Sequence, residues 1–536
     1  MKRHENKIST RGFNLNMSPF YKSNLIKEIM RHFVYTILFS ATLLLSGCSD
    51  DLTRDNPNQI TAETYWKTAN DALAGVNAIY STLHRGAISR WLFFYTIIRS
   101  DEGTSTSPNP AIVNNMQQFI VTDYNYGECY GIWNDNYIGI NRANQVIDYL
   151  PAIEMNQALK DQYMGEALFF RAYFYFNLAS LWGNVPLFTK TQVATDKPAT
   201  TSQDLIWAQV ETDLNEAAKL LPVKYTGKDL GRVTRGAAYA LLAKAYMQHQ
   251  KYNEALTPLQ WLVEGEGKNI YGLVSDYREN FMITSENNKE SVFEWQFAEN
   301  LSETTDDDIA TPNHNYGTSI AKFFSPSGIG WSDGEALRWP VYEFLSETTT
   351  TGDRDPRLAA TFIYDSTDER GGAFTNVYGA SFNSRYPNSQ RIWFRKFLND
   401  HYKNEEDYRS QNNYRFIRYA DVLLMYAECL NATGSTNDAY QYVDMVRNRA
   451  GLASLSVIKP GMSQAAFLEQ IKHERLTELC GEGHRWNDLV RWGELGPGLA
   501  ERDPGFENFK VGRDELLPIP QQEIDINPNL DQNPEW

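Results

Sequence analysis

Residues 234–243 read Thr234-Arg235-Gly236-Ala237-Ala238-Tyr239-Ala240-Leu241-Leu242-Ala243 and open a helix in which small and apolar side chains recur at helical spacing. Tyr246 follows Ala243 by three residues, and Ala255 follows Tyr246 by nine. Small residues let two antiparallel helices approach closely, and the aromatic ring fills the space between them. This spacing predicts a helix-turn-helix unit of the tetratricopeptide type.

A second unit of the same kind lies nearer the C-terminus, with Leu423 and Tyr426 on its first helix, Gly434 at the turn and Val443 on its second helix. Helical periodicity also marks 68–83, 134–150, 160–182, 203–220, 232–264, 415–450 and 463–492. Between 265 and 414 the period fades, and Gly, Pro, Asn, Asp and aromatic residues are mixed. We therefore predict an all-α dominated protein whose tetratricopeptide-like helix pairs form a scaffold, about 60–264 and 415–492, that carries a loop-rich aromatic lobe, about 265–414.

The N-terminal region carries an export signal. Phe33–Leu45 is an apolar run, too short to cross a ~30 Å hydrocarbon core as a helix but suited to the h-region of a signal peptide. It ends at Ser46-Gly47-Cys48, the pattern of a bacterial lipobox whose cysteine takes a diacylglyceryl group. We expect translation to start at Met30, since Met30-Arg31-His32 supplies a positive n-region. The expected organisation is a signal peptide over 1–47, a lipid-anchored tether over 48–59 and a single globular domain over 60–536.

The chain is acidic, with a formal net charge of −17. Phosphate backbones repel such a chain, so nucleic acid is excluded as a partner. The charge also disfavours broad contact with anionic lipid, so the membrane anchor must come from acyl chains on Cys48. The other cysteines, Cys129, Cys429 and Cys480, are odd in number and lack metal-type spacing. Export permits a disulfide among them, but the sequence does not demand one, and Cys429 has the surroundings of a buried small hydrophobe.

Several motifs occur in an order that resembles the SusD/RagB family of outer-membrane lipoproteins from Bacteroidetes. The resemblance covers nearly the whole chain after the signal peptide, and its specificity comes from the ordered set, because each motif alone is weak. Besides the lipobox, the motifs are Ala167–Tyr175, Trp182–Pro186, Gly231–Thr234, Tyr414–Leu424, Glu474–Leu479, Glu482–Gly493, Leu517–Pro520 and Asn527–Leu530.

The resemblance implies an α-helical protein with four tetratricopeptide-like helix pairs. It implies an outer-membrane lipoprotein, displayed on the cell surface, that captures nutrient glycan for a SusC-like TonB-dependent transporter. Ser49-Asp50-Asp51 is similar to the acidic export tag that sends such lipoproteins to the surface, although an ordinary polar tether would have the same composition.

Glycan capture needs flat aromatic faces for the C–H faces of sugar rings, with Asn, Asp or Arg beside them for the hydroxyls. Tyr316 and Trp331 fit best, because both lie among Gly-rich turns where an aromatic ring has little core to fill. The alternative is that each ring packs under its own loop. By the resemblance, Asn315-Tyr316-Gly317 and Gly330-Trp331-Ser332 match family positions that supply stacking aromatics, and we expect Trp331, Tyr316 and Asn315 to contact the ligand.

A second family ligand loop follows Asp101-Glu102. Here it reads Gly103-Thr104-Ser105-Thr106-Ser107-Pro108-Asn109-Pro110, with no aromatic residue. This departure suggests a different or smaller ligand contact, for which Asn109 and Asn115 are the polar candidates.

An enzyme interpretation is open for the C-terminal motif, where Glu478, Glu482, His484 and Asp488 could act as acid–base groups. Arginines alternate with these groups, as in buried structural ion pairs, and nothing marks a nucleophile or an oxyanion site, so we expect no catalytic residue. A surface-anchored glycoside hydrolase and a helical-repeat scaffold for protein or peptide remain as alternatives.

A run of acidic residues, Asp306-Asp307-Asp308, offers oxygen ligands for calcium. A solvated acidic loop accounts for the same run, so neither a cofactor nor a metal site is expected.

Overall fold

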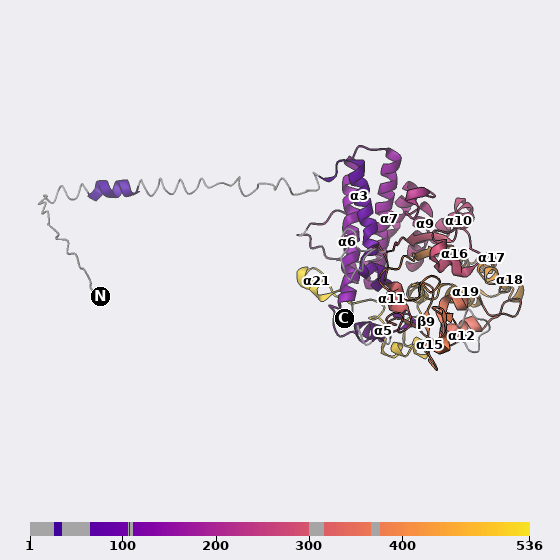
Figure 1. Ribbon diagram of the computed structural model, residues 1–536. Helices are drawn as coiled ribbons and strands as arrows, with labels where there is room; N and C mark the ends of the chain where they lie inside the picture. The colour runs from indigo at the N-terminus through magenta and orange to yellow at the C-terminus, as the bar shows by residue number, and fades with distance from the viewer. Residues whose placement is uncertain are drawn as a thin grey trace, which may run out of the picture. The chain divides into compact units, whose positions relative to one another are not determined.

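The computed structural model describes residues 26–34, 65–105, 107, 111–193, 195–299, 316–365 and 376–536. The chain divides into two compact units, Met1–Tyr65 and Trp66–Trp536. In the first unit the described residues are 26–34 and Tyr65, and residues 26–34 form a helix with exposed side chains. Cys48 and the tether lie outside the described residues. The second unit holds all the elements considered below (Figure 1).

Long helices form the first half of this unit, and Figure 1 shows them side by side. They are α3 (Ala69–Tyr80), α6 (Gly127–Tyr149), α7 (Gln157–Trp182) and α8 (Gln203–Leu220). Helix α7 packs against both α6 and α8. The close approach of α6 and α7 requires Gly139, because a Cβ atom there would lie 2.2 Å from the Phe174 ring.

The predicted tetratricopeptide-like units are present as paired helices. The first pair is α9 (Arg235–Gln248) with α10 (Tyr252–Val263), and the second is α16 (Tyr419–Ala432) with α17 (Thr436–Arg449). The side chain of Thr234 accepts a hydrogen bond from the Ala237 N–H and so caps α9. Gly434 takes a φ of +92° at the turn of the second pair, a conformation that favours glycine. Because α10 packs against α16, the two pairs form one layered scaffold.

The C-terminal part adds α18 (Leu455–Ile458), α19 (Gln464–Leu479), α20 (Arg485–Trp492) and α21 (Gln521–Ile526). The prediction of helix from residue 415 onward is wrong at its start. Residues Tyr414–Arg418 form strand β10, which pairs antiparallel with β4 (Ser291–Trp295). Aromatic and β-branched side chains favour the strand, and its arginines find carboxylate partners inside the protein.

Sequence periodicity also missed a helical segment, η2 (Ala87–Leu92), a π-helix that continues into α4 (Phe93–Ile98). All six residues of η2 are buried, and so are nearly all of those in α4. A segment that is buried on every side has no solvent-exposed face, so its sequence lacks the 3.6-residue alternation of apolar and polar residues that marks surface helices.

The region between α10 and β10 consists mainly of short elements joined by turns. The helices and strands described there, besides β4 and several 3-10 turns, are α11 (Ile320–Phe324), β5 (Glu335–Ala336), α12 (Trp339–Leu345), α13 (Arg357–Thr361), β6 (Phe362–Ile363), β7 (Asn376–Val377), β8 (Ala380–Ser381), α15 (Phe382–Arg385) and β9 (Trp393–Phe394). Elsewhere the short elements are β1 (Gly103–Thr104), α5 (Ala111–Gln117), β2 (Val185–Pro186) and β3 (Thr200–Thr201).

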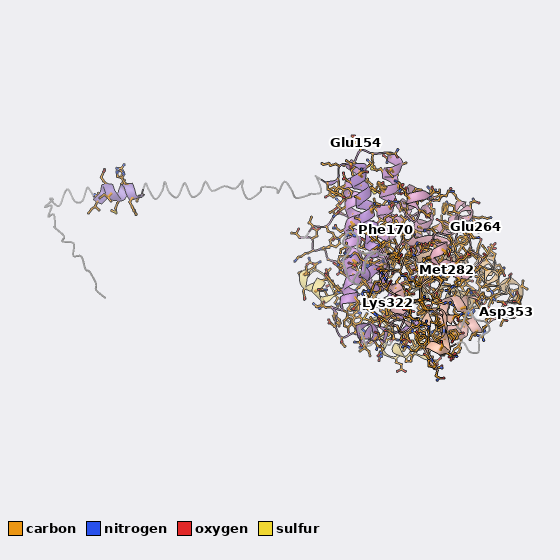
Figure 2. The ribbon with its side chains drawn as sticks, viewed as in Figure 1. Glu154, Phe170, Glu264, Met282, Lys322 and Asp353 are labelled. Atoms are coloured by element: carbon orange, nitrogen blue, oxygen red, sulfur yellow. The ribbon has the colours of Figure 1, made fainter. Side chains whose placement is uncertain are left out.

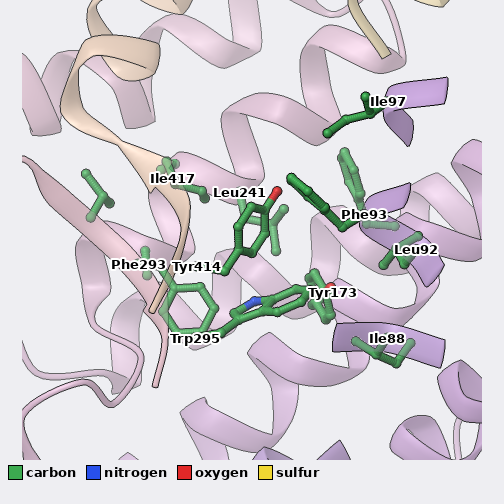
Figure 3. Packing of buried hydrophobic residues seen from close by; sticks show 14 of the residues in the cluster. Ile88, Leu92, Phe93, Ile97, Tyr173, Leu241, Phe293, Trp295, Tyr414 and Ile417 are labelled. Atoms are coloured by element: carbon green, nitrogen blue, oxygen red, sulfur yellow. The ribbon is translucent and has the colours of Figure 1, made fainter. Parts of the chain in front are cut away.

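One large hydrophobic core joins these short elements to the helical scaffold (Figure 3), and side chains fill the interior of the unit throughout (Figure 2). Tyr414 of β10 lies at a junction, with its ring centroid 4.8 Å from that of Trp295 and 5.0 Å from that of Phe93. Tyr173 of α7 also packs on Trp295, and the centroids of these two rings lie 6.1 Å apart. The short elements therefore rest on a rigid helical base.

Candidate functional site

Trp331 lies on the turn between α11 and β5, and its ring is 49% exposed. Its backbone N–H donates to the carbonyl of Lys322, a residue labelled in Figure 2, over 2.8 Å. The ring packs edge-on against Phe323 at 4.8 Å and against Tyr408 at 5.5 Å between centroids. Half of the ring is thus fixed by neighbours while the other half faces solvent.

The side chain of Tyr316 is also exposed, at 46%. The segment that carries Tyr316 pairs with the segment that carries Tyr408. Thr318 and Ser410 exchange backbone hydrogen bonds of 2.8 and 3.2 Å. Gly317 permits this approach, because a Cβ atom there would lie 3.0 Å from the carbonyl carbon of Arg409. The structure therefore brings both predicted aromatics to the segment 406–410. We refer to Tyr316, Trp331 and Tyr408 as the aromatic patch.

Buried groups hold the patch from below. The guanidinium of Arg90 lies 4.1 Å from the ring centroid of Trp91 and 4.4 Å from that of Phe323, which supports Trp331. Arg90 is fully buried and donates to the hydroxyl of Ser319 over 3.3 Å. A cation between aromatic faces in a desolvated position fixes both rings. The Trp331 side of the patch is therefore preorganised, which lowers the entropy cost of binding a ligand.

Polar groups border the patch on the segment 406–410. Arg409 donates to Asp407 through Nε at 2.9 Å and through a terminal nitrogen at 2.6 Å. Burial opposes the charge of Asp407, but the hydrogen bonds from Arg409 outweigh it and lower the pKa of Asp407. Both side chains are partly exposed, so they can offer hydrogen bonds to hydroxyl groups beside the aromatic faces.

Glu406 anchors the same segment from within. Its carboxylate accepts hydrogen bonds from the Tyr378 hydroxyl and, over 2.7 Å, from the Asn399 N–H. Burial raises the pKa of Glu406 to about 7, although these donors act against the rise. Tyr408 and its polar neighbours were not among the predicted site residues, and the only sequence signal is an aromatic residue within a polar stretch.

Of the other predicted ligand residues, the structure describes only Asn115. Asn315 and Asn109 lie outside the described residues, as do the three aspartates 306–308 considered for calcium. Asn115 is half-buried on α5, and its carbonyl accepts the Ile120 N–H over 2.9 Å. Its neighbour Asn114 lines a cleft of about 500 Å³ together with Gln117 and Asp503.

The acidic groups of the C-terminal motif form a buried ion-pair network, as the alternation of charges indicated. Arg418 donates to Glu290 over 2.6 Å, to Glu478 over 2.9 Å and to Glu482 over 2.7 Å, and all four side chains are fully buried. Burial alone would raise the pKa of Glu478, but Arg449, Arg418 and Arg357 outweigh it and lower the pKa to about 2.

His484 and Asp488 have structural surroundings of the same kind. Burial lowers the pKa of His484 to about 4, so the ring is neutral. Asp488 accepts from Arg475 Nε over 2.7 Å. Asp488 is thus fixed by its ion pair with Arg475 at the junction between α19 and α20, whereas His484 lines a cavity together with Lys244 and Asp488.

The described residues include three of the four cysteines. Cys129, Cys429 and Cys480 are buried and unpaired, which confirms the prediction for Cys429. None of the helices that the structure describes is both long enough and apolar enough to cross a bilayer.

Comparisons with known proteins cover most of the chain. A family model described as "SusD family" matches residues 289–536, and a model described as "Starch-binding associating with outer membrane" matches residues 95–247. The curated "SusD-like protein P25" of Formosa agariphila is 27% identical, with 94% of this chain and 98% of that protein covered.

Solved structures agree with this assignment. A SusD superfamily protein from Bacteroides vulgatus is 27% identical, with a TM-score of 0.77, and the match covers 88% of this chain and 100% of that one. Surface glycan-binding protein A from Bacteroides thetaiotaomicron, solved with laminarihexaose, is 25% identical, with a TM-score of 0.70 and coverage of 87% and 99%. The chain belongs to the SusD/RagB family.

Proposed function

We propose that this protein is a non-catalytic, surface-anchored glycan-binding protein and that its aromatic patch contacts the glycan. The observation that carries the proposal is the half-exposed ring of Trp331, which is held edge-on by Phe323 and Tyr408 over a buried base. An exposed aromatic face that is fixed in this way suits the apolar face of a sugar ring. The similarity to a protein solved with laminarihexaose supports the ligand class.

We further propose that the protein passes its ligand to a SusC-like TonB-dependent transporter. Cys48 would hold it at the outer membrane through a lipid, and the name of one matching family model refers to this membrane. Anchoring beside the transporter raises the effective glycan concentration at its entrance, so weak capture is sufficient.

The proposal for the ligand is tested by isothermal titration calorimetry of residues 49–536 against a glycan panel that includes laminarihexaose. Binding of at least one glycan, with no release of reducing sugar, is expected. Release of reducing sugar would instead establish a glycoside hydrolase. Binding of peptides and of no glycan would establish the scaffold alternative.

The proposal for the partner is tested by purifying the lipidated protein from detergent-solubilised outer membranes. A TonB-dependent transporter is expected to co-purify in near-stoichiometric amount. Its absence from the purified protein, in a detergent that preserves other outer-membrane complexes, would overturn this part of the proposal.

A further inference from the structure

A cluster of metal-ligating side chains lies where the chain after α12 meets α19, on elements that do not belong to the aromatic patch. Glu347, His473 and Glu474 each offer one ligand atom, and these three atoms lie within 4.8 Å of one another. Helices α12 and α19 pack against each other; His473 and Glu474 lie on α19, and Glu347 lies just after the end of α12.

The imidazole of His473 is held in the orientation that a metal ligand needs. Its Nδ1 lies 2.9 Å from Oε2 of Glu343. Because an ionised carboxylate can only accept a hydrogen bond, Nδ1 is the donor in this contact. A carboxylate that accepts from one ring nitrogen leaves the other, Nε2, as the nitrogen available for a metal.

In each carboxylate of the cluster, one oxygen accepts a hydrogen bond from Arg447 and the other does not. Arg447 donates to Oε2 of Glu347 over 2.8 Å and to Oε1 of Glu474. The second oxygen of Glu347 has Lys459 Nζ at 4.0 Å. The second oxygen of Glu474 is fully buried and accepts no hydrogen bond from any residue in the described ranges; the Arg357 guanidinium lies 3.6 Å from it.

A buried carboxylate oxygen without a hydrogen bond is costly, and a bound cation would satisfy it. The neighbouring arginine does not fill this role, because Arg357 directs its shorter contacts of 2.7 and 3.2 Å to Asp355 and Glu478.

Carboxylates surround the imidazole. Glu343 lies 2.9 Å from Nδ1, and Glu347 and Glu474 each place an oxygen within 4.8 Å of a ring nitrogen. The facing cations are Arg447, Arg357 and Lys459, as described above, and Arg485 and Arg502, which act on Glu343. His473 and its partner Glu343 also line a cleft of about 500 Å³, so the imidazole side of the cluster borders this cleft.

We propose that Glu347, His473 and Glu474 bind a divalent transition-metal ion, with water completing the coordination. One imidazole nitrogen with two carboxylate oxygens suits Zn²⁺, whereas Ca²⁺ and Mg²⁺ prefer oxygen alone. Such an ion would join the end of α12 to α19, and its binding is independent of the glycan proposal.

The test is calorimetric titration of Zn²⁺ into tag-free residues 49–536 after chelator treatment, repeated with His473→Gln, Glu343→Gln and His249→Gln. His473→Gln keeps an amide that can donate to Glu343 but removes the imidazole, and we expect it to abolish specific Zn²⁺ binding. Glu343→Gln should weaken Zn²⁺ affinity by ~10–100-fold through the orientation of His473. His249 is the matched control, a partly exposed histidine 2.9 Å from Glu211, and its substitution should leave affinity unchanged.

Thermal unfolding with and without Zn²⁺ supplies the second readout, because binding to the folded state alone raises the midpoint. The expected rise is present in the wild-type protein and in His249→Gln and absent in His473→Gln. Absence of Zn²⁺ binding by the wild-type protein, or equal binding by wild type and His473→Gln, would overturn the proposal.

Discussion

Replacing Arg418 by methionine should destabilise the protein strongly. Arg418 is fully buried and donates to Glu290, Glu478 and Glu482. Lys396 still pairs with Glu482 in the variant, and Arg449 still pairs with Glu290 and Glu478, but one buried negative charge loses its compensation. Removing one partner of a buried ion pair costs about 3–5 kcal/mol in the free energy of unfolding.

The loss of stability in Arg418→Met should depend on pH in a predictable direction. The pKa of Glu478 in the folded protein, about 2, lies below its ordinary value of 4.5. A carboxyl group with a lowered folded-state pKa contributes stability above its ordinary pKa, and this contribution is lost as the pH falls toward the folded-state value. In Arg418→Met the pKa values of Glu478 and Glu482 rise, so their protonation in acid relieves the unpaired charge. The deficit should be largest near pH 7 and should shrink toward pH ~4.

The assay is urea-induced unfolding of wild type and variant, followed by tryptophan fluorescence at both pH values. Arg235→Met is the matched control, because Arg235 is partly exposed and lies 3.7 Å from the exposed Glu266. A surface pair of this kind is worth about 0–1 kcal/mol. If Arg418→Met lost no more stability than Arg235→Met, or if its deficit were the same at both pH values, the description of this network as a buried, charge-balanced cluster would be wrong.

Further predictions concern the aromatic patch and the anchor. Tyr408→Ala should weaken glycan binding by ~2–10-fold in calorimetry, because it removes one aromatic contact worth about 0.5–1.5 kcal/mol; unchanged affinity would exclude Tyr408 from the patch. Gly317→Ala should cost about 1–3 kcal/mol in urea unfolding, since its methyl group meets the Arg409 backbone at 3.0 Å, whereas Gly127→Ala, with open space around it, should not. Cys48→Ala should move the protein from the membrane pellet to the soluble fraction; retention in the pellet would contradict lipid anchoring.

The helical scaffold could be predicted because its pattern is local. Helix α8 begins at Gln203 and ends at Leu220, within the range that periodicity indicated, since one face is polar and the other is buried. The same reasoning failed at η2 and α4, which are buried on all faces, and at β10, whose strand pairing with β4 depends on residues more than a hundred positions away. Local periodicity reports neither burial on all faces nor pairing between distant segments.

In the candidate site, too, local features could be predicted from the sequence and long-range contacts could not. Trp331 and Tyr316 could be singled out because aromatic residues among glycines have little local core to fill. Tyr408 could not, because its place beside Trp331 follows from the pairing of Thr318 with Ser410, a contact between distant parts of the chain. The contact of the buried Arg90 with Phe323 could not be predicted either, since Phe323 lies on a distant part of the chain.

Titration of laminarihexaose, or of the tightest glycan in the panel, into wild type, Trp331→Ala, Tyr316→Ala and Tyr342→Ala tests the central claim most directly. With 49% of Trp331 exposed, ~100 Å² of a side chain that buries ~150–250 Å² is free for the ligand. At ~25 cal/mol per Å², covering this area contributes about 2.5 kcal/mol, or ~60-fold in Kd. Tyr342, which is 60% exposed, is the control and should leave affinity unchanged. A loss of this size in Trp331→Ala with the fold intact is predicted; unchanged binding in both Trp331→Ala and Tyr316→Ala would contradict the account.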